Sequence, residues 1–156
     1  MTLTFRNLEG DPRAPVSTWP YEAIVTAIER GLIGDWARLT AEIALDPWGE
    51  VARQVEEYLA YAEPGGVTAL LHRAIVRARE SAEENERAVV ASEVRRLHDR
   101  SGLSAEQFAR RIGTSRTRLS TYRTGSVTPS AALMVRMRAV ADAQPTSARI
   151  TRRPRG

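Results

Sequence analysis

Two residue types are absent from this chain: it has no cysteine, and all 23 of its basic residues are arginine, because lysine is missing as well. The lack of cysteine excludes disulfides and thiolate metal sites, and it agrees with a reducing compartment. A coding bias toward GC-rich codons explains an all-arginine complement, although the planar guanidinium also suits phosphate and guanine. The type of basic residue therefore identifies no partner by itself.

Long apolar runs are missing too. No stretch approaches the roughly 18 apolar residues that a membrane span needs, and the N-terminus lacks a basic segment followed by an apolar one. We therefore expect a cytoplasmic protein without a membrane partner. Its 156 residues, 42% of them hydrophobic, suffice for one compact domain or two small ones.

Side chains suited to catalysis are scarce. The two histidines are His72, which we expect to be a half-buried structural residue on an amphipathic helix, and His98. The neighbouring glutamates at 56–57 and 83–84 cannot face each other on a helix. The sequence has no glycine-rich phosphate loop and no zinc-ligand spacing. It thus predicts no enzyme, no cofactor and no metal site.

Charge is distributed unevenly along the chain. Residues 1–80 contain 8 arginines against 12 acidic residues, whereas residues 81–156 contain 15 against 7. All three tryptophans and three of the four tyrosines precede residue 62. The distribution predicts an acidic module with its own aromatic core, joined to a basic module.

The acidic half should be helical after residues 1–18, which have no helical period and are expected to be extended or loosely packed. Four helices are predicted from apolar periodicity and capping signals. The first helix should start at a Thr18 cap and end at Gly31, and the second should start at an Asp35 cap. The third should start at Asp46-Pro47 and end at Pro64-Gly65-Gly66, and the fourth should start at a Thr68 cap. Their inward side chains should be Tyr21, Ile24, Val25 and Ile28; Trp36, Leu39 and Ile43; Val51, Val55, Tyr58 and Leu59; and Leu70, Leu71, Ala74, Ile75 and Ala78.

Residues 81–93 contain good helix formers of mixed charge and neither glycine nor proline. This segment either continues the fourth helix directly into the basic half or breaks near Ser81. Its apolar positions are too sparse for a coiled coil, so we expect a solvated connecting helix.

A helix-turn-helix is predicted in the basic half. Ser104, followed three residues later by Gln107, forms a capping box, so a helix should begin at Ala105. Phe108 lies on its inner face, and Gly113 suits the left-handed position that ends it.

The second helix of the pair should run from about residue 116 to residue 124 and stop at Gly125. Thr114 and Ser115 both offer an N-cap hydroxyl for it. Two helices this short with so tight a turn must cross steeply, as in the DNA-binding motif.

The spacing also predicts which face of the second helix is free. Leu119 and Tyr122 share one side and should pack inward. The opposite side contains no acidic and no large apolar residue, and it consists of Thr117, Ser120, Thr121 and Thr124, with Arg116 and Arg118 on its flanks.

Residues 94–141 resemble the lambda-repressor-like, Cro/CI-type helix-turn-helix regulators, also called the xenobiotic-response-element family. The residues that carry this resemblance are Gly102-Leu103-Ser104, Phe108-Ala109, Ile112-Gly113, Ser115-Arg116, Leu119-Ser120, Tyr122, Gly125 and Pro129-Ser130. In that family, the positions of Ser115, Arg116, Thr117 and Thr121 approach bases or phosphates, and the helix N-terminus at Ala105 faces the DNA backbone.

The resemblance, the outward face of the second helix and the basic tail together predict two sets of DNA contacts. Base contacts are assigned to Arg116, Thr117, Ser120 and Thr121. Phosphate contacts are assigned to Ser104, Thr114, Ser115, Arg118, Arg123, Ser126, Arg152 and Arg153.

Two departures from the family pattern concern these contacts. Many members pair an acidic residue near the end of the recognition helix with an arginine on the first helix, whereas this chain has Arg123 opposite His98. Either Asp99 or Glu93 compensates, or Arg123 is released toward a phosphate. In addition, Ala105 and Ser126 stand where glutamine and lysine are common.

A closing helix is expected after a Thr128 cap and Pro129, with Leu133, Met137 and Val140 inward and Arg136 and Arg138 outward, ending at Gln144-Pro145. The remaining residues hold four arginines and no acid, so we expect disorder there.

The predicted fold class is all-α, with an N-terminal helical module joined to a C-terminal lambda-repressor-like domain. The predicted divisions are an extended segment at 1–18, a dimerisation or partner module at 19–80, a connecting helix at 81–93, the DNA-binding domain at 94–143 and a disordered basic tail at 144–156. The predicted function is a sequence-specific transcriptional regulator, such as a repressor, that binds double-stranded DNA at the nucleoid as a homodimer. The alternatives are an antitoxin-type adaptor, whose acidic half binds a partner protein, and an architectural DNA binder.

Overall fold

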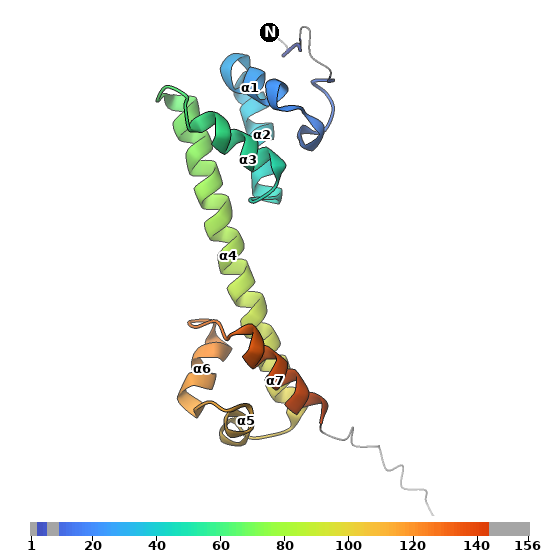
Figure 1. Ribbon diagram of the computed structural model, residues 1–156, viewed down its shortest axis with the longest axis vertical. Coiled ribbons are helices and arrows are strands. Elements are labelled where there is room, and N and C mark those ends of the chain that lie inside the picture. Colours follow the sequence, from blue (N-terminus) through green and yellow to red (C-terminus); the bar gives the residue numbers. More distant parts are fainter. Residues whose placement is uncertain (1–2, 6–9, 144–156) are drawn as a thin grey trace, which may run out of the picture. The chain divides into compact units, whose positions relative to one another are not determined.

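The computed structural model of the chain describes residues 3–5 and 10–143, and within these ranges it contains seven α-helices, one short 3-10 helix and no strand (Figure 1). The chain divides into two compact units that meet between Glu84 and Asn85. Each unit has its own buried apolar cluster. The all-α fold class is thereby confirmed.

The elements follow one another in the order η1 (Val16–Thr18), α1 (Tyr21–Arg30), α2 (Ile33–Leu45), α3 (Glu50–Leu59), α4 (Gly66–Ser101), α5 (Ala105–Ile112), α6 (Arg116–Thr124) and α7 (Ala131–Asp142). The alternative left open for α4 is decided in favour of one helix of 36 residues, within which Ser81 lies. None of its residues from 76 to 90 is buried, as expected of a solvated connecting segment.

The core of the first unit is made by the helix faces that apolar periodicity predicted. Its buried members include the predicted residues Ile24, Ile28, Leu39, Ile43, Val51, Val55, Leu71 and Ile75. Arg79 anchors the N-terminal part of α4, since its guanidinium reaches the Glu56 carboxylate at 2.6 and 2.9 Å and the Pro47 carbonyl at 3.0 Å. One predicted inward position is wrong, because Leu70 is exposed. The other predicted positions that are not fully buried are half-buried: Tyr21, Val25, Trp36, Tyr58, Leu59, Ala74 and Ala78.

Residues 10–19 pack more closely than predicted for a loose segment. Val16 is buried in η1, and Trp19 is buried with Phe5 edge-on to its ring at 5.2 Å between centroids. The Arg38 guanidinium holds the carbonyls of Pro12 and Ala14 at 2.6 and 2.7 Å. An arginine from α2 thus replaces the helical hydrogen bonds that this segment lacks.

Two predicted N-caps of the first unit are wrong, because one of the residues lies before its helix and the other lies within its helix. Thr18 lies in η1 and donates to the Pro15 carbonyl, and α1 begins after Pro20. Asp35 is the third residue of α2 rather than its cap, and its carboxylate accepts the Leu32 N–H at 2.9 Å.

The starts of α3 and α4 were also misplaced. Asp46 ends α2, and α3 begins only after Gly49. Thr68 lies inside the first turn of α4, where its hydroxyl accepts the Gly65 N–H at 2.8 Å. Thr68 thus satisfies a free N–H at the start of α4, which is the chemistry expected, but from a different position, whereas the N-cap of α3 makes no side-chain hydrogen bond.

The second unit is built around the last turns of α4. Its buried cluster joins Val94 and Leu97 of α4 to Phe108, Ala109, Ile112, Leu119, Tyr122, Leu133, Met137, Val140 and Ala141. The predicted Thr128 cap of α7 is wrong, because Ser130 is the N-cap and accepts the Leu133 N–H at 3.2 Å. The predicted helix end at Gln144-Pro145 and the basic tail lie outside the described residues.

Candidate nucleic-acid interface

The start of α5 has the reciprocal hydrogen bonds of a capping box. The Ser104 Oγ accepts the Gln107 N–H at 3.2 Å, and the Gln107 Oε1 accepts the Ser104 N–H at 3.0 Å. The helix ends at Gly113, whose φ of 81° is left-handed. Both boundaries are those predicted, since both depend on residues within one turn of the helix end.

The turn into α6 is closed by Ser115, whose Oγ accepts the Arg118 N–H at 3.1 Å. Of the two hydroxyls that the sequence offered, this one is the cap, whereas Thr114 donates its N–H to the Ala109 carbonyl at 2.9 Å. At the far end Gly125 has a φ of 82°, and a Cβ there would lie 3.4 Å from the Ala91 Cβ. The left-handed φ therefore favours glycine, whereas a Cβ would make only an ordinary contact.

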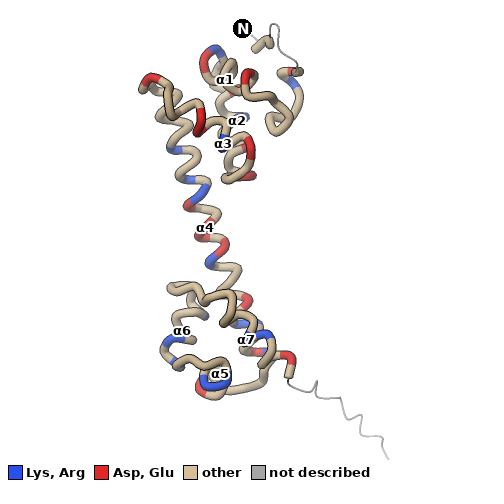
Figure 2. The backbone as a smooth tube through the Cα atoms, in the orientation of Figure 1, with Lys and Arg blue, Asp and Glu red and all other residues tan. Residues whose placement is uncertain are grey.

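The inner and outer faces of α6 are those that the spacing predicted. Leu119 and Tyr122 are buried in the core, which holds the helix by its inner side. On the outer side Arg116, Thr117 and Ser120 are exposed. Arginines lie along α5, α6 and α7 of this unit (Figure 2).

Hydrogen bonding distinguishes the hydroxyls of the outer face. Thr121 is half-buried and donates to the Arg118 carbonyl at 2.7 Å, so it offers outward only a methyl and lone pairs. Thr117 and Ser120 have no side-chain partner among the described residues, so their hydroxyls are free both to donate and to accept. The structure thus separates free hydroxyls from committed ones in the predicted base-contact set.

The two arginines that flank this face also differ in hydrogen bonding, since one side chain has a protein partner and the other has none among the described residues. The Arg118 Nε donates to the Tyr122 hydroxyl at 3.1 Å, which draws its side chain along the helix. Arg116, the first residue of α6, has neither a hydrogen bond nor an ion pair within the described part of the chain. Its whole guanidinium is available to a ligand.

Four of the eight predicted phosphate contacts are short hydroxyl residues near helix ends, and the other four are arginines. Ser104 and Ser115 accept backbone N–H groups through their oxygens, which leaves each O–H proton for donation. The Ser126 hydroxyl instead donates to the Thr121 carbonyl at 3.3 Å. Arg152 and Arg153 lie outside the described residues.

His98 and Arg123 occupy the place where the resemblance leads one to expect an ion pair. His98 is buried on Phe108 and donates its Nε2 proton to the Leu103 carbonyl at 3.0 Å. Neither acidic candidate pairs with Arg123 among the described residues: Glu93 binds Arg96 at 2.7 Å, and the Asp99 carboxylate has no partner there. Compensation by an acid is therefore wrong, and the buried Arg123 Nε remains without a partner.

Two arginines support the motif without having been predicted to do so. Arg136 of α7 donates to the Ile112 carbonyl at 3.1 Å, and Arg95 of α4 donates to the Arg123 carbonyl. Each satisfies a carbonyl at the C-terminal end of α5 or α6, where cations are favoured. Their partners lie 24 and 28 residues away, so no local pattern could have indicated the pairing.

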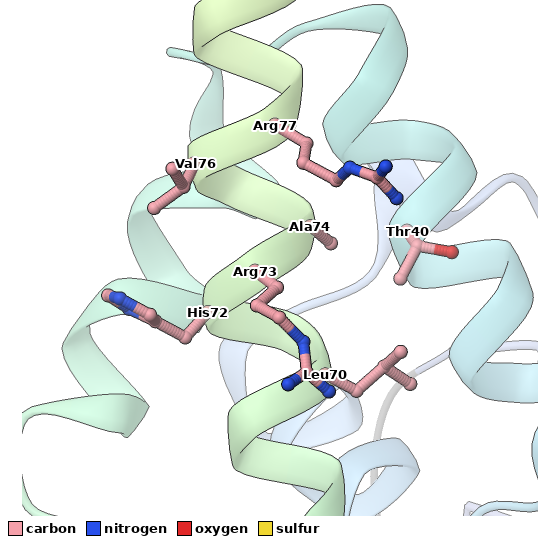
Figure 3. Close-up of a pocket in the computed structure, with 7 residues that line it drawn as sticks. All are labelled: Thr40, Leu70, His72, Arg73, Ala74, Val76 and Arg77. Carbon is pink, nitrogen blue, oxygen red and sulfur yellow. The ribbon is translucent and has the colours of Figure 1, made fainter.

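The first unit has a groove of about 510 Å³ between Thr40 of α2 and the N-terminal part of α4. Ala74 and Arg77 point toward Thr40, whereas His72 points away from it (Figure 3). His72 is exposed, so its predicted half-buried position is wrong. Within the described ranges no cluster of acidic residues and histidines is suited to a metal ion, and no helix is both long and apolar enough to span a membrane.

Comparison with known proteins supports the class that this geometry defines. Residues 89–149 match the family model of a helix-turn-helix domain. No curated protein and no solved structure matches the chain. The C-terminal unit is thus a helix-turn-helix domain, a DNA-binding class, and α5 and α6 are the two helices of its motif.

Proposed function

We propose that the protein is a sequence-specific transcriptional regulator of the Cro/CI type that reads the DNA major groove with α6. The observation that carries this proposal is the outer face of α6. It presents the unpartnered guanidinium of Arg116 and the free hydroxyls of Thr117 and Ser120, with no acidic residue beside them.

Arg116 is the residue that we assign to direct base reading. It begins α6, and the N-terminal residues of a recognition helix are those that reach base edges. An arginine in that position pairs with the O6 and N7 atoms of guanine through two parallel hydrogen bonds. Thr121 offers its methyl group to a thymine methyl, because its proton is already donated to Arg118.

Phosphate contacts hold this helix in register, and the second unit has the charge for them. Residues 85–156 contain 15 arginines against 5 acidic residues. We assign phosphate contacts to Ser104, Thr114, Ser115, Arg118, Arg123 and Ser126. Release of counterions from these phosphates supplies affinity that does not depend on sequence.

The active form that we propose is a homodimer acting in the cytoplasm at the nucleoid, with no catalytic role and no cofactor. One helix-turn-helix reads half a site, and a two-fold operator needs two of them about 34 Å apart. The module at residues 19–80 is the part that we assign to joining the two copies. The tryptophans there differ in exposure: Trp19 is buried, and Trp48 is 47% exposed.

Binding of the full chain to DNA from upstream of its own gene tests this proposal. We expect a footprint with two-fold symmetry and an affinity at least about 10³ times that for random duplex, as specific binders have. Equal affinity for both duplexes would overturn sequence reading and leave an architectural DNA binder.

A second candidate function is an antitoxin-type adaptor, which the charge and exposed apolar residues of the first unit favour. Residues 1–84 hold 8 arginines against 14 acidic residues, and Leu45 and Trp48 are exposed there. Co-purification of one protein in fixed stoichiometry with the full chain, followed by loss of that protein's activity in the complex, would select this function.

A further inference from the structure

The outward side of α2 carries no charged residue. It is formed by six exposed residues: Ile33, Gly34, Ala37, Ala41, Ala44 and Leu45. At 100° per residue they span an arc of about 120° opposite the buried Leu39 and Ile43. A solvated helix normally carries charged and polar side chains on this side. Here Ile33 is 78% exposed and Leu45 is 82% exposed, so a substantial apolar helix face lies open.

The sizes of these residues follow a two-fold pattern along the helix. The bulky Ile33 and Leu45 stand at the two ends, and only glycine and alanine lie between them. When a second α2 is laid antiparallel with its centre at residue 39, Ile33 meets Leu45, Gly34 meets Ala44 and Ala37 meets Ala41. Each pair combines residues of similar size, as a surface that binds a copy of itself requires.

We infer that α2 is the dimer contact, and that it packs antiparallel against α2 of a second copy of the chain. Small residues in the middle let the two helix axes approach to the short end of the usual 8–10 Å range. Ile33 of each copy then covers Leu45 of the other. This inference rests on the proposed function, because the role of the dimer is to join two DNA-reading units. The α2 contact itself forms without DNA.

The area of the face agrees with a weak dimer. The 120° outward arc of a 13-residue helix presents roughly 250 Å², taking a rise of about 1.5 Å per residue and a diameter of about 12 Å. Trp48, which follows α2 and is 47% exposed, adds on the order of 100 Å². Two copies would bury about 700 Å², which is below the roughly 1,200 Å² of stable interfaces and fits a weak, transient dimer.

Electrostatics predicts how this contact responds to salt. Pairing the two faces buries no charge and therefore carries no desolvation penalty for ions. The two acidic units repel each other at longer range, because residues 1–84 hold 8 arginines and 14 acidic residues. Added salt screens that repulsion and should strengthen the dimer, whereas it weakens phosphate binding by the second unit.

A competing apolar groove lies between α4 and α7 of the second unit. It has a volume of about 380 Å³ and is lined by Val89, Val90, Met134 and Val135, with Glu93 and Arg138 also in its lining. Unlike the α2 face, this groove contains charged side chains. It provides the comparison site for the experiment.

Sedimentation of the full chain without DNA tests the inference. We expect a concentration-dependent dimer that tightens or stays unchanged between low and high salt. Ala41→Glu should raise the dissociation constant at least tenfold, because it places two carboxylates beside the two-fold axis. Ala69→Glu is the matched control, an exposed alanine of α4 in the same unit. Val135→Glu tests the competing groove, and neither of these two variants should change the dissociation constant.

A charge-swap mixture separates self-association from any other occupant of the face. Ala41→Glu and Ala41→Arg should each be monomeric with an unchanged circular dichroism spectrum, and their equimolar mixture should associate again. A monomeric wild-type chain, a dimer insensitive to Ala41→Glu, or a dimer lost only with Val135→Glu would overturn the α2 contact. Failure of the proposed DNA reading would leave these sedimentation results unchanged, so the two failures are distinguishable.

Discussion

The reading of bases is predicted to depend most on Arg116, which begins α6 and has no partner within the described residues. Arg116→Ala should cost roughly 1–3 kcal/mol of binding free energy on the operator and relax the preference at one base pair. Fluorescence anisotropy on the operator and on variants of each base pair measures both effects.

The control for this substitution is Arg73→Ala, which removes an exposed arginine from the first unit and should leave DNA affinity unchanged. If Arg116→Ala weakens operator and random duplex by the same factor, Arg116 contacts a phosphate rather than a base.

Glu93 provides a pH-dependent contribution to the stability of the second unit. Hydrogen bonds from Arg96 at 2.7 and 2.8 Å lower the pKa of this carboxyl below its ordinary value of 4.5. A carboxyl whose pKa is lowered by folding stabilises the native state above its unfolded pKa, and this contribution is lost as pH falls through the folded pKa. Glu93→Gln should therefore destabilise the protein slightly near neutral pH and have no effect in strong acid.

Urea unfolding of both proteins between about pH 7 and pH 3 measures this difference. The difference in unfolding free energy should shrink below pH 4.5. A constant difference across the whole range would mean that Glu93 acts through packing and not through its charge.

At the scale of the element, α6 depends on its N-cap. Ser115 satisfies the Arg118 N–H at 3.1 Å, and removing such a cap costs about 0.5–2 kcal/mol. Ser115→Ala should lower the unfolding free energy by this amount. Ser120→Ala is the matched control, because its hydroxyl has no partner among the described residues and its loss should change stability by less than about 0.5 kcal/mol.

The effects on DNA discrimination should be reversed: Ser120→Ala should reduce discrimination between DNA sequences more than Ser115→Ala does. Ser120 lies on the outer face of α6, so its loss should affect binding without affecting unfolding. Thermal unfolding measures stability, and anisotropy measures binding. Equal stability of the two variants would mean that Ser115 is not needed as a cap.

At the scale of the whole molecule, the arginines beyond residue 143 should act as an electrostatic tether. The sequence has four there, Arg149, Arg152, Arg153 and Arg155, with no acidic residue. Each phosphate that is neutralised steepens the log-log salt dependence by about 0.9, so removal of residues 144–156 should flatten the slope by up to roughly 3–4 per chain. Base preference should be retained.

Titrations of operator DNA at several salt concentrations, with the full and the shortened chain, measure this slope. An unchanged slope after truncation would show that the tail arginines do not neutralise phosphates.

Local signals in the sequence determined the helix-turn-helix almost completely. The Ser104 capping box, the left-handed Gly113 and Gly125 and the inner positions of α6 all depend on residues within one or two helical turns, so pattern and spacing suffice to predict them. The same holds for the buried stripes of α1 and α3, where one face is apolar and the other is not.

The tertiary structure decided what depends on residues distant in sequence or on a choice between similar patterns. The Arg136 bond to Ile112 and the burial of His98 join different helices, and no local pattern indicates them. Asp35 and Thr68 show that a polar side chain near a helix start can satisfy the free N–H groups from more than one position. On α2 periodicity correctly predicted that Leu39 and Ile43 are buried, but only the structure shows that the apolar Ile33 and Leu45 on the opposite side stay exposed. Packing buries Leu39 and Ile43 and leaves the opposite side exposed, because only one side of a helix at the edge of so small a core meets other helices.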